Sequence, residues 1–113
     1  MIKKEGAMIK YFTDKSGNHA FKLESTNGNT LLESISYNNK TDLEQVAANL
    51  TILVTKPLLF ERKTNYKGEF LFMLKDDQGK VVGNSKLYTS EAGMENGIKN
   101  LRNIVVPNTT STP

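Results

Sequence analysis

Histidine, cysteine and paired carboxylates are the residue types most often found in catalytic and metal sites, and this sequence offers few of them. It has one histidine, His19, and no cysteine, so it lacks the residues for a thiolate nucleophile or a zinc site of imidazoles and thiolates. The carboxylates Asp76 and Asp77 stand in a polar turn, whereas general acid–base catalysis needs a carboxylate shielded from water. We therefore predict no catalytic residue, no cofactor, no metal ligand and no enzymatic activity.

Structural roles account for the same residues. His19 alternates with Phe21 and Leu23 along a predicted strand, which favours a partly buried, structural imidazole. The glycines follow turn spacing, and none belongs to a phosphate-binding loop with its lysine and hydroxyl residue.

Basic and aromatic residues raise the question of nucleic-acid binding. The net charge of +3 is spread along the chain, whereas nucleic-acid-binding proteins usually gather basic residues on one face. An antiparallel sheet can nevertheless stack bases on exposed aromatic side chains, and the candidate residues for this are Tyr11, Phe12, Arg62, Lys63 and Lys86. Weak nucleic-acid binding through the sheet face is therefore the alternative function. It would weaken steeply with salt, whereas a protein–protein contact would not.

Length and composition indicate one small domain. The chain has 113 residues, 37% of them hydrophobic, and a mean hydropathy of −0.46, which allows a modest core. It shows no apolar run of the length of a signal peptide or a membrane span. With no cysteine to suggest an oxidising compartment, we expect a cytoplasmic protein without a membrane partner.

An internal repeat organises the sequence. Setting Phe21 against Phe72 aligns the chain with itself at an offset of 51 residues and without a gap. The aligned residues are glycines at turns and apolar residues at strand or helix spacing, where backbone geometry and packing dictate the residue type, so the alignment predicts a duplicated fold. The other matched pairs are Gly17/Gly68, Leu23/Leu74, Gly28/Gly79, Ser34/Ser85, Tyr37/Tyr88, Leu43/Met94 and Leu50/Leu101.

The same residues resemble the YegP-like family. The second copy carries the family pattern in Phe60-Glu61, 67–75, 78–82, Ser85 and 88–98. The first copy fits more loosely, with Ile9 for the Phe, His19-Ala20 at the start of the Phe strand and Val46-Ala47 for Gly-Ile. The resemblance implies β-β-β-α units joined into one antiparallel sheet with exchanged helices. It implies no activity and no site residues, because the family is a domain of unknown function.

The predicted fold is α+β: two tandem β-β-β-α repeats that form one antiparallel sheet with two helices packed on one face. Whether the helices are exchanged between repeats stays open. The prediction is a single domain, 1–113, with repeat one at about 8–55, repeat two at about 58–106 and a disordered tail at 107–113 after a loose leader at 1–7. The predicted strands are 8–13, 19–25, 30–36, 59–63, 69–75 and 80–86.

Two helices complete the predicted repeats. Thr41 and Glu44 fit a capping box for the first helix, which should end near the β-branched residues at Thr51. Thr89-Ser90 offers the N-cap of the second. Gly93 and Gly97 lie inside that second helix on one side, which predicts the close approach of a neighbouring backbone from the sheet or the other helix, with a ligand contact as the alternative.

The predicted function is a small non-enzymatic module for protein binding or self-assembly. In the central strand of the second copy, Leu71 and Met73 lie on the face away from Phe72, where the first copy has Ala20 and Lys22, which read as water-facing. Adjacent exposed apolar side chains usually mark a contact surface, and methionine adapts to varied partners. Leu71 and Met73 are therefore the candidate interaction surface, and the alternative is that the leader with Ile2 and Met8, or the connector at 51–59, covers them. The partner and the oligomeric state cannot be read from the sequence.

Overall fold

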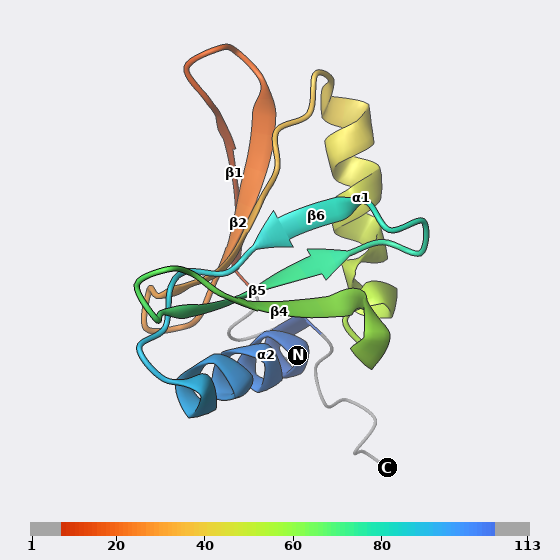
Figure 1. Ribbon diagram of the computed structural model, residues 1–113. Coiled ribbons are helices and arrows are strands. Elements are labelled where there is room, and N and C mark those ends of the chain that lie inside the picture. Colours follow the sequence, from red (N-terminus) through yellow and green to blue (C-terminus); the bar gives the residue numbers. More distant parts are fainter. Residues whose placement is uncertain (1–7, 106–113) are drawn as a thin grey trace.

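The computed structural model describes residues 8–105 (Figure 1). The predicted leader at 1–7 and tail at 107–113 lie outside these residues. The elements in chain order are β1 (Met8–Thr13), β2 (His19–Glu24), β3 (Thr30–Ser34), α1 (Lys40–Leu53), a 3-10 turn (Pro57–Leu59), β4 (Phe60–Thr64), β5 (Phe70–Lys75), β6 (Val81–Asn84) and α2 (Glu91–Val105).

The six strands form one antiparallel sheet in the order β1-β2-β3-β6-β5-β4. The first half of the chain, 8–55, supplies three neighbouring strands and the second half, 57–105, supplies the other three. The halves meet at β3 and β6, where Glu33 pairs with Asn84 and Ser34 with Gly83. A β-carbon on Gly83 would lie 2.7 Å from the Glu33 carbonyl oxygen, so this junction requires glycine. The predicted α+β fold with one antiparallel sheet and two helices is confirmed.

The same hydrogen bonds recur 51 residues apart. The Ser34 Oγ accepts a bond of 2.9 Å from the Phe21 N–H, and the Ser85 Oγ accepts one of 2.9 Å from the Phe72 N–H. Backbone bridges join His19 to Tyr37 in the first half and Phe70 to Tyr88 in the second. Four turn glycines have φ between 81° and 87°, and they form two pairs at the same offset: Gly17/Gly68 and Gly28/Gly79. These recurrences support the predicted duplication, which itself stays a prediction.

The strands β3 and β6 end earlier than predicted, at Ser34 and Asn84. The Ser34 hydroxyl donates to the Ile35 carbonyl at 2.8 Å, and the Ser85 hydroxyl donates to the Lys86 carbonyl at 2.7 Å. Because this local bond occupies the next carbonyl, the chain leaves the ladder near the serine in both halves.

The first helix begins and ends differently from the prediction. Its N-cap is Asn39, whose Oδ1 accepts a bond of 2.8 Å from the Asp42 N–H, so the expected capping box at Thr41 is wrong. Its last residue is Leu53, which is buried; burial outweighs the extended preference of the β-branched residues near Thr51. In the second helix the predicted cap is confirmed, since the Ser90 Oγ accepts a bond of 3.0 Å from the Gly93 N–H.

Both helices pack on one face of the sheet and share one core. Phe21 and Phe72 are fully buried at equivalent positions, as predicted. In Figure 1, α1 runs vertically and α2 horizontally, and each contributes its apolar stripe to the same cluster. The central members of this cluster are Phe21, Leu23, Leu32, Leu43, Leu50, Phe72, Leu74, Met94, Ile98 and Leu101.

Candidate functional site

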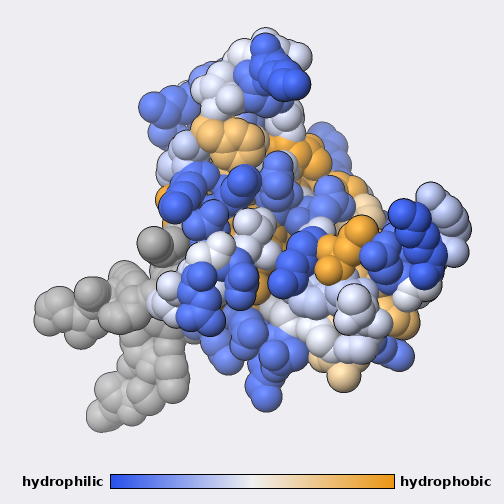
Figure 2. Space-filling view, turned by 90° about the vertical axis from the view of Figure 1, so that its left-hand side faces the viewer, coloured by the Kyte–Doolittle hydropathy of each residue, from blue (hydrophilic) through white to orange (hydrophobic). Residues whose placement is uncertain are grey.

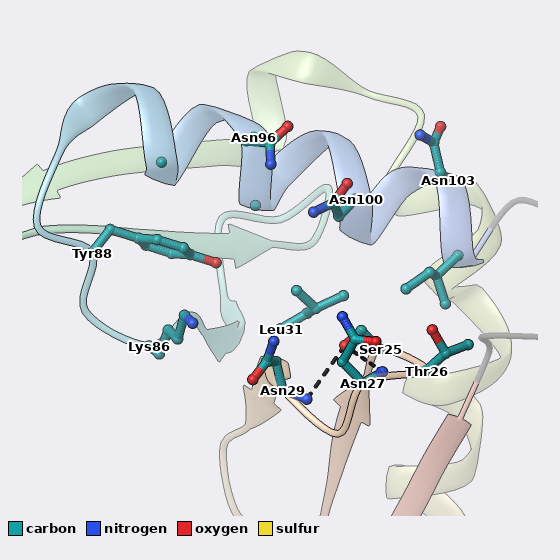
Figure 3. Close-up of a pocket in the computed structure, with 13 residues that line it drawn as sticks. Ser25, Thr26, Asn27, Asn29, Leu31, Lys86, Tyr88, Asn96, Asn100 and Asn103 are labelled. Atoms are coloured by element: carbon teal, nitrogen blue, oxygen red, sulfur yellow. Dashed lines mark hydrogen bonds between the residues drawn. The ribbon is translucent and has the colours of Figure 1, made fainter.

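A hollow lies between α2 and the turn that joins β2 to β3. Its volume is about 630 Å³. The turn 25–29 forms one wall and α2, with Ile104, the other, while Tyr88 and Leu31 line the space between them. Figure 3 shows α2 above the turn, with the Tyr88 ring extending beneath the helix. We call this space the amide groove, because five of its lining side chains are carboxamides.

The carboxamides come from both walls. Asn96, Asn100 and Asn103 follow one another along α2 at helical spacing, so they lie on one side of the helix. Asn27 and Asn29 come from the facing turn, and Figure 3 shows their amide groups directed toward α2. Within residues 8–105, none of these five side chains makes a hydrogen bond to another residue. Each carboxamide can therefore offer two N–H donors and a carbonyl acceptor to a ligand.

Turn chemistry fixes the lower wall. The Ser25 Oγ accepts hydrogen bonds of 3.3 Å from the backbone N–H groups of Asn27 and Asn29. Gly28, with φ of 87°, closes the turn. These bonds hold the two asparagines at the tip of a short, rigid hairpin, with their side chains outside it.

Gly97 allows Tyr88 to lie under the helix. A β-carbon on Gly97 would lie 2.2 Å from the Tyr88 hydroxyl oxygen, so any other residue would displace the ring. The approaching group is thus a tyrosine side chain, and the expectation of a neighbouring backbone at Gly93 and Gly97 is wrong. The Tyr88 hydroxyl is buried and has no hydrogen-bond partner among residues 8–105. Burial raises the pKa of Tyr88, so it is a neutral donor near pH 7.

Lys86 supplies the charge of the amide groove. It is the only charged residue among those described that line the groove. Its Nζ lies 5.2 Å from the centroid of the Tyr88 ring, a cation–π distance. The groove therefore combines neutral donors and acceptors with one positive charge.

A second hollow occupies the equivalent place between α1 and the turn that joins β5 to β6. It consists of two adjoining cavities of about 290 and 470 Å³. Each residue of the amide groove has its counterpart there 51 positions away, Tyr88 with Tyr37 and Asn100 with Asn49 among them. The charged lining residues are Asp42, Asp76, Asp77 and Lys80. We call this second space the acidic groove.

The predicted interaction surface lies on the helix-free face of the sheet. Leu71 and Met73 are half-buried there, since Lys63 is the cross-strand neighbour of Leu71 and Glu61 that of Met73. Glu61 also pairs with Lys75 in an ion pair. The two apolar side chains are therefore partly accessible, and their role in binding stays a prediction.

On the same face of the sheet, the β2 residues of the first half are less exposed than expected. Ala20 is 2% exposed, so its description as water-facing is wrong. Phe12 is its cross-strand neighbour, and a large ring beside a small side chain removes it from water. Lys22 and Glu24 are half-buried, with the Lys22 Nζ 5.6 Å from the Phe12 ring centroid.

The structure does not bring together the residues considered for nucleic-acid binding. Tyr11 faces Phe21 at a ring distance of 6.4 Å on the helix side, whereas Phe12 lies on the opposite face of the same strand. Arg62 is bound through two nitrogens to Glu95 of α2, and this hydrogen bonding lowers the pKa of Glu95. Lys86 lies in the amide groove. These groups form no shared basic–aromatic surface.

The other expected structural roles agree with the geometry. His19 is half-buried, as predicted. The Asp76 Oδ1 accepts bonds from the N–H groups of Gln78 and Lys80 at 2.8 and 3.0 Å, a turn role. Over the described part of the chain, no three histidine, aspartate or glutamate side chains gather as metal ligands would. Within residues 8–105, neither helix has the length and apolar character needed to cross a bilayer.

Hydrophobic residues do not form one large patch on the side of the molecule seen in Figure 2, where they are separated by hydrophilic side chains. The amide groove was not predicted from the sequence. Two signals could have indicated it. One is the spacing of asparagine at 96, 100 and 103. The other is that the repeat alignment places the neutral Thr26 and Asn29 opposite the charged Asp77 and Lys80.

Comparison with known proteins adds a family to this fold. The family model described as "Domain of unknown function (DUF1508)" matches residues 66–105. The UPF0339 protein in the ptx operon 5′ region of Stutzerimonas stutzeri is 32% identical over 95 residues, covering 84% of this chain and 86% of that protein. The UPF0339 protein PA0329 of Pseudomonas aeruginosa is 35% identical over 92 residues, covering 78% and 80%.

A solved structure agrees with these relatives. The solution NMR structure of YegP from Escherichia coli, described as a protein of unknown function, has a TM-score of 0.84 and 26% identity, and the match covers 89% of this chain and 87% of that one. The resemblance noted in the sequence is thereby confirmed. With identity above 30% over most of both chains, this chain belongs to the UPF0339 family of YegP-like proteins, whose function is uncharacterised.

Proposed function

We propose that this chain is a non-enzymatic protein-binding module and that the amide groove holds an extended segment of a partner polypeptide. The observation that carries the proposal is the set of carboxamides on facing walls of one groove, from α2 and from the β2–β3 turn. A peptide group offers one N–H donor and one C=O acceptor, and a carboxamide can pair with both.

The dimensions of the groove fit a short peptide. Asn96 and Asn103 are seven residues apart on α2, which is about 10 Å along a helix axis. An extended chain covers that length with about three residues. The turn on the opposite wall brings Asn27 and Asn29 within the same groove, so a bound segment would meet amides on two sides.

The competing classes have less support. The described lining of the amide groove contains no histidine or carboxylate, the usual groups for acid–base catalysis. It contains one cation, whereas nucleic acid is bound by several along its phosphates. The cysteine-free sequence agrees with a cytoplasmic location, which we include in the proposal.

Self-association is a second candidate function. Leu71 and Met73 are accessible on the helix-free face of the sheet, at the positions where the first half has Ala20 and Lys22. That local difference between the halves is the observation in its favour.

The test of the main proposal is a selection of random linear peptides displayed on phage against the immobilised protein. The variant is Asn96→Ala with Asn100→Ala, and the matched control is Gln45→Ala with Asn49→Ala at the equivalent positions of the acidic groove. All four side chains are exposed on helices, where alanine is the best helix former, so folding should be unaffected.

We expect selected peptides to bind the variant more weakly by about 1–3 kcal/mol, the contribution of two neutral hydrogen bonds, and to bind the control as tightly as the parent. Peptides that bind all three proteins equally, or a selection that yields none, would refute the amide groove as a protein-binding site.

A further inference from the structure

The positive charge at the amide groove has no partner in the described structure. Among residues 8–105, Lys86 takes part in no ion pair, whereas Lys10 pairs with Glu24, Lys56 with Asp77 and Lys75 with Glu61. The nearest recorded group is the Tyr88 ring. Because the ring lies beneath α2, it holds the Lys86 amine beside the groove.

The equivalent groove has the opposite charge. Asp42, Asp76 and Asp77 line it against the single cation Lys80. An anionic ligand would meet attraction in one groove and repulsion in the other, and juxtaposed like charges are a common means of rejecting a wrong partner. The structure therefore distinguishes the two grooves by charge as well as by hydrogen bonding.

We infer that the partner segment is acidic: it carries an aspartate or glutamate whose carboxylate binds the Lys86 amine while its main chain pairs with Asn96 and Asn100. This inference rests on the proposed function and adds the chemical class of the ligand. Lys86 precedes α2 in the chain, and Asn96, Asn100 and Asn103 follow one another toward the other end of the helix. The carboxylate is thus bound at one end of the groove and the backbone along the rest.

A carboxylate on a peptide fits better than a phosphate chain. The groove has five amides and one amine, a ratio that suits a mostly neutral backbone with a single negative charge. A nucleic acid would place a charge at every nucleotide and leave most of them without a cation.

The test uses the whole chain and amide-resolved NMR. The probes are short peptide libraries, capped at both ends, with neutral residues at random around a central Glu, Gln or Lys, and a single-stranded oligonucleotide. The signals of Asn96, Asn100 and Lys86 report the amide groove, and those of Gln45 and Asn49 report the acidic groove. Lys86→Met removes the charge, and Lys80→Met is its control in the acidic groove; both lysines are exposed.

We expect the Glu library to bind at the amide groove about two- to fivefold more tightly than the Gln library, the effect of one solvent-accessible ion pair. Lys86→Met should abolish this difference, and Lys80→Met should leave it. Two results would overturn the inference and leave the proposed function standing: equal binding of the Glu and Gln libraries, or tighter binding of the Lys library. If no library shifts the groove signals, or only the oligonucleotide does, both fail.

Discussion

The two grooves occupy equivalent places in the two halves of the chain, yet their linings differ almost completely. The tyrosines, Tyr88 and Tyr37, are shared, and so are Asn100 and Asn49. Elsewhere asparagine and small hydroxyl residues in the amide groove stand where the acidic groove has aspartate, glutamine and lysine. Core residues and turn glycines, by contrast, are alike across the halves. The similarity is thus concentrated where packing and backbone geometry constrain the residue, and the difference where a ligand would be bound.

One position shows how the difference affects structure. Gly97 leaves room for the Tyr88 hydroxyl, whereas Val46 occupies the equivalent site in α1. Burial, followed by the charges of Asp76 and Asp42, raises the pKa of Tyr37, while burial alone raises that of Tyr88. The aromatic ring is retained in both halves, but Lys86 is the charged residue that lines the groove beside Tyr88, whereas aspartates outnumber lysine in the groove beside Tyr37.

The largest expected effect tests what the halves share. Phe21→Ala and Phe72→Ala should each lower the free energy of unfolding by about 3–5 kcal/mol, because each deletes a fully buried ring at an equivalent place. Chemical denaturation monitored by circular dichroism measures both. Costs that differ by more than about 2 kcal/mol, the scatter seen among similar core sites, would show that the two positions are not energetically equivalent.

Gly97→Val tests how the halves differ. This variant has at position 97 the valine that the first half has at position 46. It should destabilise the protein by about 1–3 kcal/mol through overpacking, because the new β-carbon overlaps the Tyr88 hydroxyl. Gly93→Ala is the matched control: its β-carbon would meet the Ser90 Oγ at 3.1 Å and Tyr88 at 3.7 Å, and alanine improves helix propensity by up to about 1 kcal/mol. Thermal unfolding distinguishes them. A Gly97→Val protein as stable as the parent would mean that Tyr88 moves without cost.

Sequence reasoning was most successful for constraints that are local or periodic. The strand at 8–13 was predicted with its observed bounds, because the turn after it is marked by Asp14 and Gly17. The Phe21 and Phe72 positions followed from the repeat. Helix starts were less certain: Asn39 and Thr41 are both good N-caps, and only the observed bond from the Asp42 N–H decides between them.

The amide groove depends on contacts across the two halves, which the sequence did not reveal. Its walls come from the β2–β3 turn and from α2, and the pairing of β3 with β6 joins the two halves that carry them. Leu71 and Met73 were placed on the correct face from strand alternation, but the partial cover by Glu61 and Lys63 follows from the register with β4, which alternation alone does not give.

Tyr88→Phe should stabilise the protein by about 1 kcal/mol. The Tyr88 hydroxyl is buried without a partner among residues 8–105, and an unsatisfied buried polar group costs about that much or more. Tyr37→Phe is the control, since its hydroxyl is not among the buried unpaired groups in the described part of the chain; we expect little change. Thermal unfolding of both variants measures the difference. Destabilisation by Tyr88→Phe would show that the hydroxyl has a bonding partner in solution.

Substitutions on the helix-free face of the sheet, where the halves also differ, should have the smallest effect on stability. Leu71 and Met73 are half-buried, so replacing them with Lys and Gln removes little apolar surface from the fold and should change the free energy of unfolding by less than about 1 kcal/mol. If these residues mediate self-association, Leu71→Lys with Met73→Gln should lower the mass measured by light scattering, whereas Lys22→Gln, at the position equivalent to Met73, should not. A destabilisation of more than about 2 kcal/mol, the effect of losing a fully buried leucine, would instead identify Leu71 and Met73 as ordinary core residues. An unchanged mass at unchanged stability would exclude this face as a self-association surface and leave the amide groove as the contact site.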